Sequence, residues 1–411
     1  MTTVTSVSTE DFPPPPEPDL TPAQVVARAE AIAASLVERQ AETEKRTYYA
    51  EDTHEQFREA GFYRILVPRR YGGYEFGVET FMRVAMAIAR GCPSTGWGYL
   101  FGAAHALPVA SLFGREAQDE VFAGGDFICP ITVGPTGSGV RTEDGSWLVN
   151  GNWGYSSGAP YATHFVGHTL VSGEDGPRPL MFLLPRAQWQ RLDDWGNGLG
   201  LKGSGSHTIR VENVVVPPHR VLEAHVSQLP VTEGTPGREL HGNPEYGGGP
   251  LSFMLLELGV LSVGIAQGAL DAYADLMRTR TTTYLPIVPR AEDTDYQFHY
   301  GEAVSKIGAA EAAVLGALRQ WSETCARGAA AFTRETELRL ALISKQAIAL
   351  TWSAVSDHLF PTAGSSAVKA GERIERVWRD LSMLHSHAGV GLFLGGKAGR
   401  ELARLTFGVP E

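Results

Sequence analysis

Two histidines stand one residue apart near the end of the chain, in RDLSMLHSHAGVGLF (residues 379–393). Histidine is the commonest metal-binding side chain, so His385 and His387 first suggest a metal site. If this stretch is helical, however, positions two apart lie on nearly opposite faces. The pair then cannot close on one ion as histidines four apart can. We therefore expect no metal site, and we expect the two side chains to face different surroundings.

Three other places carry side chains that could do chemistry. His105 lies in GAAHALP at the end of an apolar helical stretch, where a lone histidine is most often a hydrogen-bonded core residue. Ser156 and Ser157 lie in a Gly-rich turn, GYSSG. Arg278 and Arg280 lie in LMRTRTTTY, where cations at a helix C-terminus are favoured by the helix dipole and are ordinarily solvated.

Three apparent motifs lack the context that would make them functional. GLGLKG (residues 198–203) matches a dinucleotide-binding pattern, but strand-like sequence follows where a helix N-terminus should hold a pyrophosphate. GYSSG (residues 154–158) matches a hydrolase nucleophile elbow, which needs a strand-to-helix turn, but β-type sequence lies on both sides. GLFLGGKA (residues 391–398) lacks the Ser/Thr and the preceding strand of a P-loop. None of the three therefore predicts its usual function.

The composition narrows the class of protein. The chain has 411 residues, of which 43% are apolar and 20% charged, as expected for a globular protein of roughly two to three compact units. A net charge of −11 argues against nucleic acid or an anionic membrane as the main partner. We expect no apolar run of the ~20 residues that cross a bilayer, and the N-terminus lacks signal-peptide features. We therefore predict a cytoplasmic protein, in which Cys92, Cys129 and Cys325 are buried and form neither disulfides nor a zinc site.

The pattern of apolar residues and turn residues along the chain predicts helices, then a β-domain, then helices. Helical periodicity begins at Thr21, a candidate N-cap, followed by Pro22 in the first turn. Short β-rich runs between Gly, Asn and Pro turns predict a compact antiparallel barrel or sandwich, and the later helical stretches suit an antiparallel bundle. The predicted segments are a disordered leader (1–20), an N-terminal helical domain (21–125), a β-barrel domain (126–230), a loop (231–250) and a C-terminal helical bundle (251–411).

Five segments follow one another in a specific order: VPRRYGG (67–73), NGNWGYSSGA (150–159), GLGLKGSGSHTIRVENVVVP (198–217), GIAQGALDAYADLMRTR (264–280) and RVWRDLSMLHSH (376–387). This ordered combination resembles the acyl-CoA dehydrogenase superfamily over nearly the whole chain from Thr21. The resemblance implies an α+β, mostly α fold with an N-terminal helical domain, a central β-barrel and a C-terminal four-helix bundle. It also implies a flavin between barrel and bundle.

The chain departs from true dehydrogenases where their chemistry lies. In those enzymes an Arg-Asp pair is followed by Tyr-Glu-Gly, and the Glu removes a proton from the acyl-CoA. Counted from Arg379 and Asp380, the Tyr position here is His387 and the Glu position is Ala388, which cannot take a proton. The other known location for that base falls near Met254, about one turn before Glu257, a weak substitute. A divergent dehydrogenase therefore stays only an alternative.

The sequence is instead similar to the oxygenase components of two-component (group D) flavin monooxygenases, such as the p-hydroxyphenylacetate hydroxylase oxygenase and dibenzothiophene monooxygenase. That group carries a His at the position of His387, a Ser in the β-domain turn and a His at the end of the helix before the barrel, here His105. By this resemblance His387, His105 and Ser157 are the catalytic candidates. The residues implied to bind the cofactor are Ser156, Ser157, Trp153, Lys202, Ser204, Ser206, Arg278, Arg280 and His387.

The resemblance implies a reaction of reduced FMN or FAD with O₂ through a C4a-hydroperoxide, which hydroxylates a small aromatic, phenolic substrate. An imidazole at His387 can hydrogen-bond a peroxide near neutral pH, and His105 can take the phenolic proton. No NAD(P)H site is predicted, so an NAD(P)H:flavin reductase must supply the reduced flavin by diffusion.

Long apolar stretches in the C-terminal helices indicate a homo-oligomer, a homotetramer by resemblance. Three alternatives stay open: an N-oxygenase of an amino sugar or amine, for which an aromatic-poor pocket would argue; a divergent acyl-CoA dehydrogenase; and a helical scaffold without cofactor.

Overall fold

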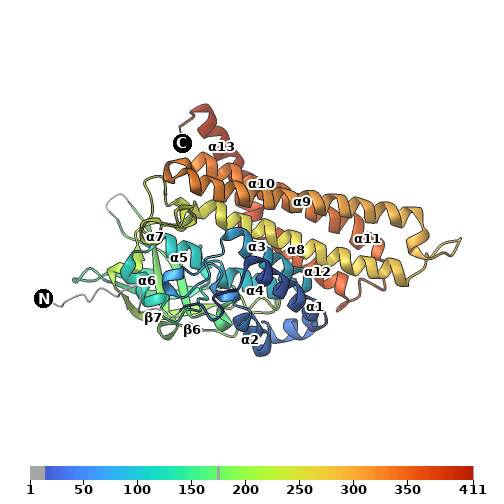
Figure 1. Cartoon of the computed structure of the whole chain (residues 1–411), viewed down its shortest axis with the longest axis horizontal. Helices are drawn as coiled ribbons and strands as arrows, with labels where there is room; N and C mark the ends of the chain where they lie inside the picture. The colour runs from blue at the N-terminus through green and yellow to red at the C-terminus, as the bar shows by residue number, and fades with distance from the viewer. Residues whose placement is uncertain (1–13, 174–175, 411) are drawn as a thin grey trace.

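The computed structural model describes residues 14–173 and 176–410. The chain is mostly helical, with two small sheets beside an array of long C-terminal helices (Figure 1). The six helices of the N-terminal part are α1 (Pro22–Arg46), α2 (Glu51–Glu59), α3 (Val78–Gly91), α4 (Pro93–Ala103), α5 (Ala106–Leu112) and α6 (Arg115–Val121). The later helices are α7 (Pro236–His241), α8 (Pro250–Thr279), α9 (Thr294–Arg327), α10 (Arg334–Ser353), α11 (Phe360–Ala363), α12 (Arg373–His385) and α13 (Ala398–Phe407).

Helix α1 begins where the sequence predicts. Thr21 is its N-cap, and its side chain and that of Gln24 form a reciprocal capping box, with Pro22 in the first turn. Residues 1–13 of the predicted leader lie outside the described residues. The leader prediction is wrong for its last residues, because Glu17 forms an ion pair with Arg28 and Leu20 is buried in the core. The prediction failed because a Pro-rich composition does not show whether a single apolar side chain, here Leu20, packs into the core.

In the part of the chain that the structure describes, eight strands form two four-stranded sheets, ordered β1-β4-β5-β8 and β2-β3-β7-β6. All pairs are antiparallel, as predicted, except that β1 runs parallel to β4. Strand β3 buries Trp147, Val149 and Trp153 on one face, which is the alternation expected of a half-buried strand. The strands are β1 (Ile131–Thr132), β2 (Ser138–Arg141), β3 (Trp147–Trp153), β4 (His164–Val171), β5 (Arg178–Pro185), β6 (Gln190–Arg191), β7 (Ile209–Val216) and β8 (Val221–Leu222).

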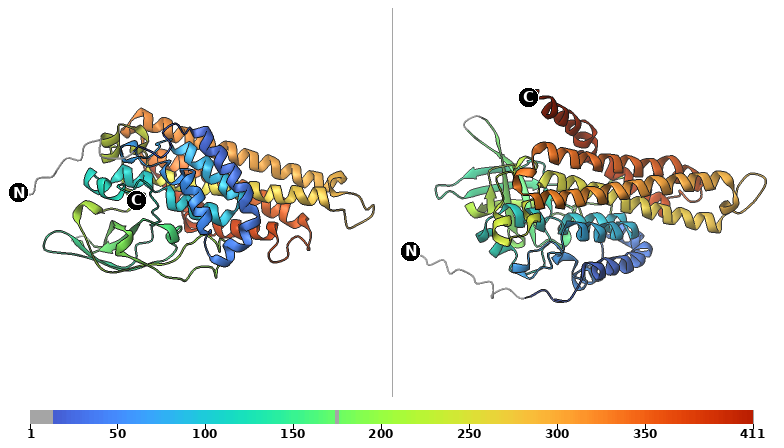
Figure 2. Two further views of the ribbon diagram at one scale, coloured as in Figure 1. Left: turned by 60° about the horizontal axis from the view of Figure 1, so that its bottom comes forward. Right: turned by 45° about the horizontal axis from the view of Figure 1, so that its top comes forward.

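The long helices of the C-terminal part lie side by side (Figure 2). Helix α8 packs against α9, α10 and α12, and on another side against α3, so it lies at the centre of the helical part. The expectation that no apolar run is long enough to span a bilayer is wrong for α8, which is both long and apolar enough by composition. However, 83% of its most apolar window is buried inside the protein, which identifies it as a core helix.

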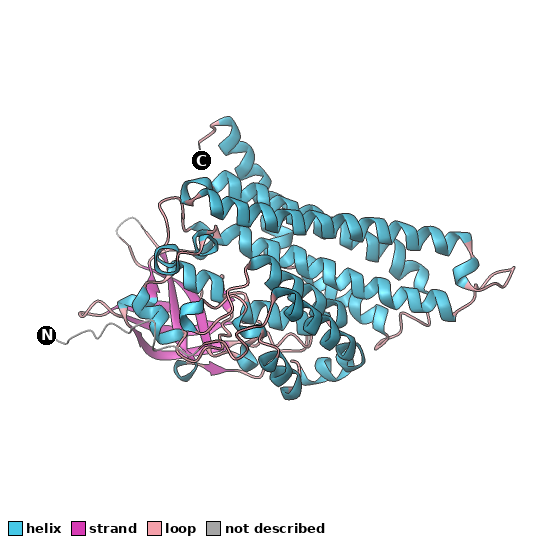
Figure 3. Cartoon of the chain, viewed as in Figure 1, coloured by secondary structure: helices cyan, strands magenta, loops and turns pink. Residues whose placement is uncertain are grey.

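Two further predictions can be compared with the structure, one for the segment between the sheets and α8 and one for the cysteines. The segment 231–250, predicted as a loop, contains α7 and a 3₁₀ helix at Pro244–Gly247, so that prediction is wrong there. Thr235 and Asn243 cap these short helices, a local signal that the Gly-rich composition masks. The three cysteines are free and buried, as predicted. The strands gather at one end of the molecule with short helices beside them, and the long C-terminal helices extend away from that end (Figure 3).

Candidate active site

A cavity of about 610 Å³ lies where the N-terminal helices, the sheets and the C-terminal helices meet. Helix α4 and the start of α8 supply most of its apolar wall, and the end of α12 with the π-helical segment Gly389–Lys397 closes another side. The polar residues that line it are few: His105, Ser157, His225, Ser227, Glu257, His387, Lys397 and Arg400. A mostly apolar pocket with few convergent polar groups is the usual form of a small-molecule site.

Aromatic rings form a continuous strip along one wall of this cavity. The His387 ring lies edge-on to Trp97, with ring centroids 5.7 Å apart. Trp97 contacts Phe101 at 4.8 Å, and Phe101 contacts His105 at 6.1 Å between centroids. Trp97 and Phe101 lie on one face of α4 because they are four residues apart. The two candidate histidines are therefore brought to the same cavity.

His387 acts as a hydrogen-bond donor toward the cavity. The backbone N–H of Gly389 donates to its Nδ1 at 3.1 Å, so in the neutral ring the proton must lie on Nε2. Burial lowers the pKa of His387, which favours this neutral form. His385, two residues earlier, is exposed and stacks on Trp352 with ring centroids 4.6 Å apart. As predicted, the two histidines face different surroundings.

His105 has the opposite tautomer. Its Nδ1 lies 2.8 Å from the carbonyl oxygen of Cys129, which can only accept, so Nδ1 carries the proton and Nε2 is an acceptor. Nε2 is buried and has no hydrogen-bond partner. Burial lowers the pKa of His105 to about 4, so the ring is neutral near pH 7. The bonded core histidine and the candidate base are thus one and the same side chain, with one nitrogen for each role.

The two serines of the GYSSG turn differ in placement. Ser157 lines the cavity, and its Oγ accepts a hydrogen bond of 2.9 Å from Nε1 of Trp97. Ser156 is fully buried, and its hydroxyl donates to the carbonyl oxygen of Trp153 at 2.9 Å. β3 precedes this turn and a 3₁₀ helix at Ala159–Tyr161 follows it, so it is not a nucleophile elbow. Ser157 is the serine available to a ligand.

A chain of hydroxyl groups extends from Ser157 into the 198–206 segment. The Oγ atoms of Ser157 and Ser206 lie 2.8 Å apart, and those of Ser206 and Ser204 lie 2.7 Å apart. Strand β7 follows this segment, which confirms that GLGLKG does not start a helix. Lys202 is half-buried in the same segment and does not line the cavity.

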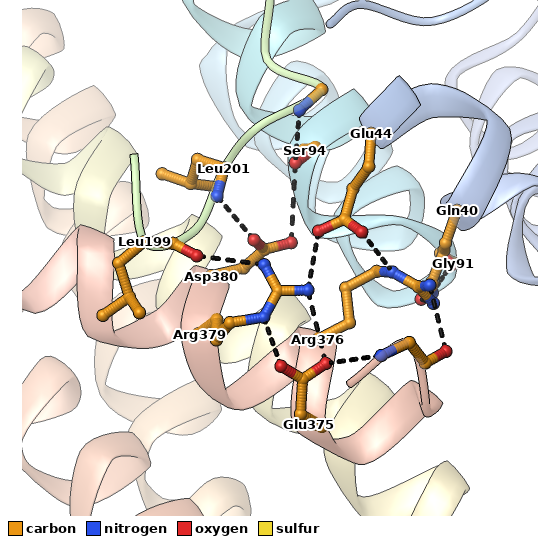
Figure 4. Close-up of polar contacts among 12 residues, drawn as sticks. Gln40, Glu44, Gly91, Ser94, Leu199, Leu201, Glu375, Arg376, Arg379 and Asp380 are labelled. Carbon is orange, nitrogen blue, oxygen red and sulfur yellow. Dashed lines mark hydrogen bonds and ion pairs between the residues drawn. The ribbon is translucent and has the colours of Figure 1, made fainter. Parts of the chain in front are cut away.

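A buried ionic network fixes α12, and with it His387, against the 198–206 segment and α4 (Figure 4). The backbone N–H of Leu201 donates to Asp380 at 2.5 Å, and Ser94 at the start of α4 lies 3.5 Å from the other carboxyl oxygen. Burial raises the pKa of Asp380 to about 7. Gly200 allows this close approach, because a Cβ there would collide with the backbone oxygen of Arg379.

The same network reaches α1 through two arginines. Glu44 accepts from Arg379 at 2.8 Å and from Arg376 at 3.1 Å, and Glu375 accepts from Arg379 at 2.5 Å (Figure 4). These side chains are largely buried, with exposed fractions between 8% and 17%, so the pairs are shielded from solvent screening. Three segments distant in sequence are thereby held together beside the cavity.

Of the predicted cofactor residues, Ser157 and His387 line this cavity, whereas Trp153, Arg278 and Arg280 lie away from it. Arg278 and Arg280 are at the far end of α8, about 20 residues after the part that lines the cavity, which is roughly 30 Å along the helix axis. Arg278 is 71% exposed and pairs with Asp275, its ordinary role at a helix end. Within one chain these arginines do not line this cavity, and their role at the cofactor stays a prediction. Trp153 lies in the core between the sheets, where its Nε1 donates to the carbonyl oxygen of His168.

Sequence reasoning undervalued Glu257 and did not identify Trp97. Glu257 lines the cavity on α8, is fully buried, and has no partner for either carboxyl oxygen. Desolvation raises its pKa well above the ordinary value. A signal was present, because Glu257 is the only charged residue in LSFMLLELGVLSVGIAQGAL. Trp97 gave no such signal, since an aromatic residue in an apolar helix ordinarily indicates core.

The residues present fit a flavin. The cavity offers a flat aromatic ring at Trp97, the hydroxyl group of Ser157 and an imidazole donor at His387, and Ser206 contacts Ser157 from behind the cavity wall. A buried acceptor without a partner, Nε2 of His105, is left for a second molecule. Among the described residues no group of three or more His, Cys, Asp or Glu is arranged to hold a metal ion.

Comparisons with known proteins agree on one group. Residues 23–123 match the family of the acyl-CoA dehydrogenase N-terminal domain, and residues 256–391 match that of the C-terminal domain. The chain is 33% identical over 369 residues to the flavin-dependent monooxygenase oxygenase subunit HsaA of Rhodococcus jostii (strain RHA1), covering 88% of this chain and 93% of that protein.

Two solved structures give the same picture. The 3-HSA hydroxylase from Rhodococcus sp. RHA1 superposes with a TM-score of 0.83 at 30% identity, covering 94% of this chain and 98% of that one. XiaF from Streptomyces sp., solved in complex with FADH2 and glycerol, has a TM-score of 0.83 at 24% identity and covers 95% and 96% of the two chains. The second likeness bears on the fold alone.

Proposed function

The chain belongs to the flavin-dependent monooxygenase branch of the acyl-CoA dehydrogenase family, and on that premise we propose that it is the oxygenase component of a two-component monooxygenase. Its substrate is a small aromatic compound, and a phenol fits the site best. The observation that carries this proposal is the pair of opposite hydrogen-bonding roles at one cavity: a donor at Nε2 of His387 and an acceptor at Nε2 of His105.

When bound, reduced FMN or FAD supplies two electrons and the place where O₂ is activated. The residues of this chain have the complementary tasks. Trp97, Ser157 and His387 would hold the flavin, with Ser206 supporting Ser157 from behind, and Nε2–H of His387 would donate a hydrogen bond to the oxygen that is to be transferred. The apolar wall excludes water, which strengthens such hydrogen bonds.

His105 has the task of a base toward the substrate. A phenolic hydroxyl that donates to Nε2 of His105 gains electron density in its ring as the proton moves away, and a neutral imidazole is the form that can accept it. The aromatic strip along the wall suits a flat substrate. The same aromatic lining disfavours an amino sugar, so the cavity supports an N-oxygenase less well than a hydroxylase of aromatic substrates.

A dehydrogenase is disfavoured by the same cavity. Ala388 stands where the resemblance places the catalytic carboxylate. The carboxyl group that does line the cavity, Glu257, is fully buried without a partner, and burial raises its pKa well above the ordinary value, which disfavours the carboxylate form that a base requires.

The wider assembly follows from the same proposal. A separate NAD(P)H:flavin reductase supplies the reduced flavin by diffusion, in the cytoplasm. The finer description of the fold is also proposed: the two sheets form one β-barrel domain, and α8, α9, α10 and α12 form a four-helix bundle. Their mutual packing supports this.

Product formation without a reductase tests the function. The protein is supplied with chemically reduced FMN or FAD, air and a simple phenol, and the hydroxylated product and H₂O₂ are measured. We expect hydroxylated product in the presence of protein. If every phenol tried yields only H₂O₂ while an acyl-CoA substrate reduces the bound flavin, the protein is a dehydrogenase instead.

A further inference from the structure

Glu257 lines the active cavity and is fully buried, and the mechanism does not use its carboxyl group. Both of its carboxyl oxygens are buried and without a partner, and the side chain is 0% exposed. A buried carboxyl group without hydrogen bonds is costly to the fold, because its lost hydration is not replaced. Such a group is retained where a ligand supplies the missing partner.

A second buried carboxyl group in the neighbouring helix shows the structural alternative. Glu337 on α10 is also buried, but the backbone N–H and the hydroxyl of Ser252 donate to it at 2.7 and 3.0 Å. It caps the start of α8 and does not line the cavity. The two glutamates therefore differ in the feature that matters here, which is whether the protein itself satisfies the carboxyl group.

We propose that Glu257 is a specificity-determining residue that hydrogen-bonds a neutral carbonyl or hydroxyl group of the substrate, at a polar point of the cavity distinct from His105. This rests on the proposed function, since it assumes that the substrate occupies the cavity. A protonated carboxyl group is a strong donor and suits a neutral oxygen acceptor. A carboxylate substituent on the substrate is disfavoured at this point, because it would face a carboxyl group that no cation of the protein contacts.

A matched pair of ligands tests the proposal in the flavin-free protein. One is para-butylphenol, and the other is the same phenol with a ketone in the butyl chain, two methylene groups from the ring, so that the phenol pKa is the same. Binding is measured by calorimetry, with quenching of the tryptophan fluorescence as a second readout. We expect the wild type to prefer the ketone, and Glu257→Leu to lose about tenfold in affinity for the ketone but not for the alkylphenol.

Two controls separate recognition from structure. Glu257→Gln keeps a hydrogen-bond donor and should keep the preference for the ketone. In thermal unfolding, Glu257→Leu should be at least as stable as the wild type, because it removes an unsatisfied buried group, whereas Glu337→Leu should be less stable. Equal affinity of the wild type for both ligands, or destabilisation by Glu257→Leu comparable to that of Glu337→Leu, would overturn the proposal.

The proposed oxygenase function and the proposed role of Glu257 can be tested independently of each other. If the wild type prefers the ketone but forms no hydroxylated product with reduced flavin and O₂, then Glu257 recognises ligands in this cavity and the reaction assignment is wrong. If the wild type hydroxylates phenols without regard to the ketone, then the reaction stands and the role of Glu257 does not.

Discussion

His105 and His387 differ in the backbone group that each one meets, and this difference sets their chemistry. The carbonyl oxygen of Cys129 forces the proton of His105 onto Nδ1, while the N–H of Gly389 forces that of His387 onto Nε2. Each ring therefore presents one defined function to the cavity, an acceptor in the first case and a donor in the second. The neutral state of both rings follows from burial, which lowers each pKa.

Replacing His105 with Asn should slow hydroxylation while the binding of reduced flavin is unchanged. Loss of a general base typically costs ~10²–10⁴-fold in rate. Activity should recover in part at high pH, because a phenol that ionises unaided no longer needs the base. The measurement is the rate of product formation from pH 6 to 10, with flavin affinity followed separately. Normal hydroxylation at neutral pH would leave His105 only its structural bond to Cys129.

Replacing His387 with Ala should uncouple the reaction rather than stop it. Removal of one preorganised donor to a developing oxygen charge costs ~10²–10³-fold in related chemistry. Reduced flavin should still be oxidised by O₂, with H₂O₂ released in place of hydroxylated product. His385→Ala is the matched control, since its ring is exposed and stacks on Trp352. Full coupling in His387→Ala, measured as product formed per flavin oxidised, would remove His387 from the site.

Glu257→Gln should stabilise the fold increasingly as the pH rises. Burial raises the pKa of Glu257 in the folded state above its ordinary value of 4.5, so the unfolded chain releases this proton first as the pH rises. The wild type then loses stability above about pH 4.5, at ~1.4 kcal/mol per pH unit until the folded state also ionises, whereas glutamine does not titrate. Urea unfolding of both proteins at pH 4.5, 6 and 7.5 measures the difference. A difference that is constant with pH would show that Glu257 is ionised in the fold.

At the residue scale, the sequence identified several side chains of the candidate site, but it did not show their distances from the cavity or their hydrogen-bond partners. His105, His387 and Ser157 were found because the resemblance places them by motif, and they do meet at one cavity. Arg278 and Arg280 do not line this cavity, which the sequence could not show, because a short motif near a helix end does not reveal how far that end lies from the cavity. The tautomers could not be predicted at all, since each depends on a backbone group from another segment or turn.

At the scale of secondary-structure elements, helix α12 and the 198–206 segment together hold the site in place. The sequence placed α12 within a predicted helical bundle, but it could not show that Asp380 would accept a hydrogen bond from the N–H of Leu201, 179 residues earlier. Gly200 is required for this contact because its hydrogen faces the backbone of Arg379. For helix α8, the apolar character was visible in the sequence, but the length of the apolar run was underestimated and the central position could not be predicted.

Asp380→Ala should loosen this arrangement. It leaves the N–H of Leu201 buried without an acceptor, and such a group costs about 2 kcal/mol of stability. We also expect weaker binding of reduced flavin, because the Ser204–Ser206 hydroxyl groups belong to the released segment. Urea unfolding and a flavin titration measure the two effects. Arg278→Ala, at an exposed position, is the control and should change stability by less than ~0.5 kcal/mol. Unchanged stability in Asp380→Ala would contradict the role of the network.

At the scale of the whole molecule, the order of helices, sheets and helices could be predicted from the helical periodicity and the β-rich runs of the sequence. The family could be predicted from the ordered motifs. The packing of residues 17–20 and the short helices within 231–250 could not be predicted, because both depend on contacts with distant segments. The surface carries large apolar side chains that no described segment covers. Tyr284 and Leu285, between α8 and α9, are 87% and 88% exposed, and Phe407 on α13 is 79% exposed.

These exposed side chains support the proposal of a homo-oligomer, with a tetramer expected from the resemblance. Exposed apolar side chains on a soluble protein commonly mark an interface. Light scattering coupled to size exclusion at micromolar concentration should therefore give a single oligomeric species. A monodisperse monomer would contradict the proposal and would leave the two apolar ends of the molecule without an explanation.

The central claim, that this cavity transfers an oxygen atom from O₂ to an aromatic substrate, is tested most directly with isotopically labelled oxygen gas. The protein is mixed with chemically reduced flavin, a phenol and heavy-isotope O₂ in ordinary water, and the product is analysed by mass spectrometry. Our account predicts one labelled oxygen atom in each hydroxylated product, with the yield falling in both His105→Asn and His387→Ala. A product whose new oxygen comes from water, or the absence of any oxygenated product while the flavin is oxidised, would contradict it.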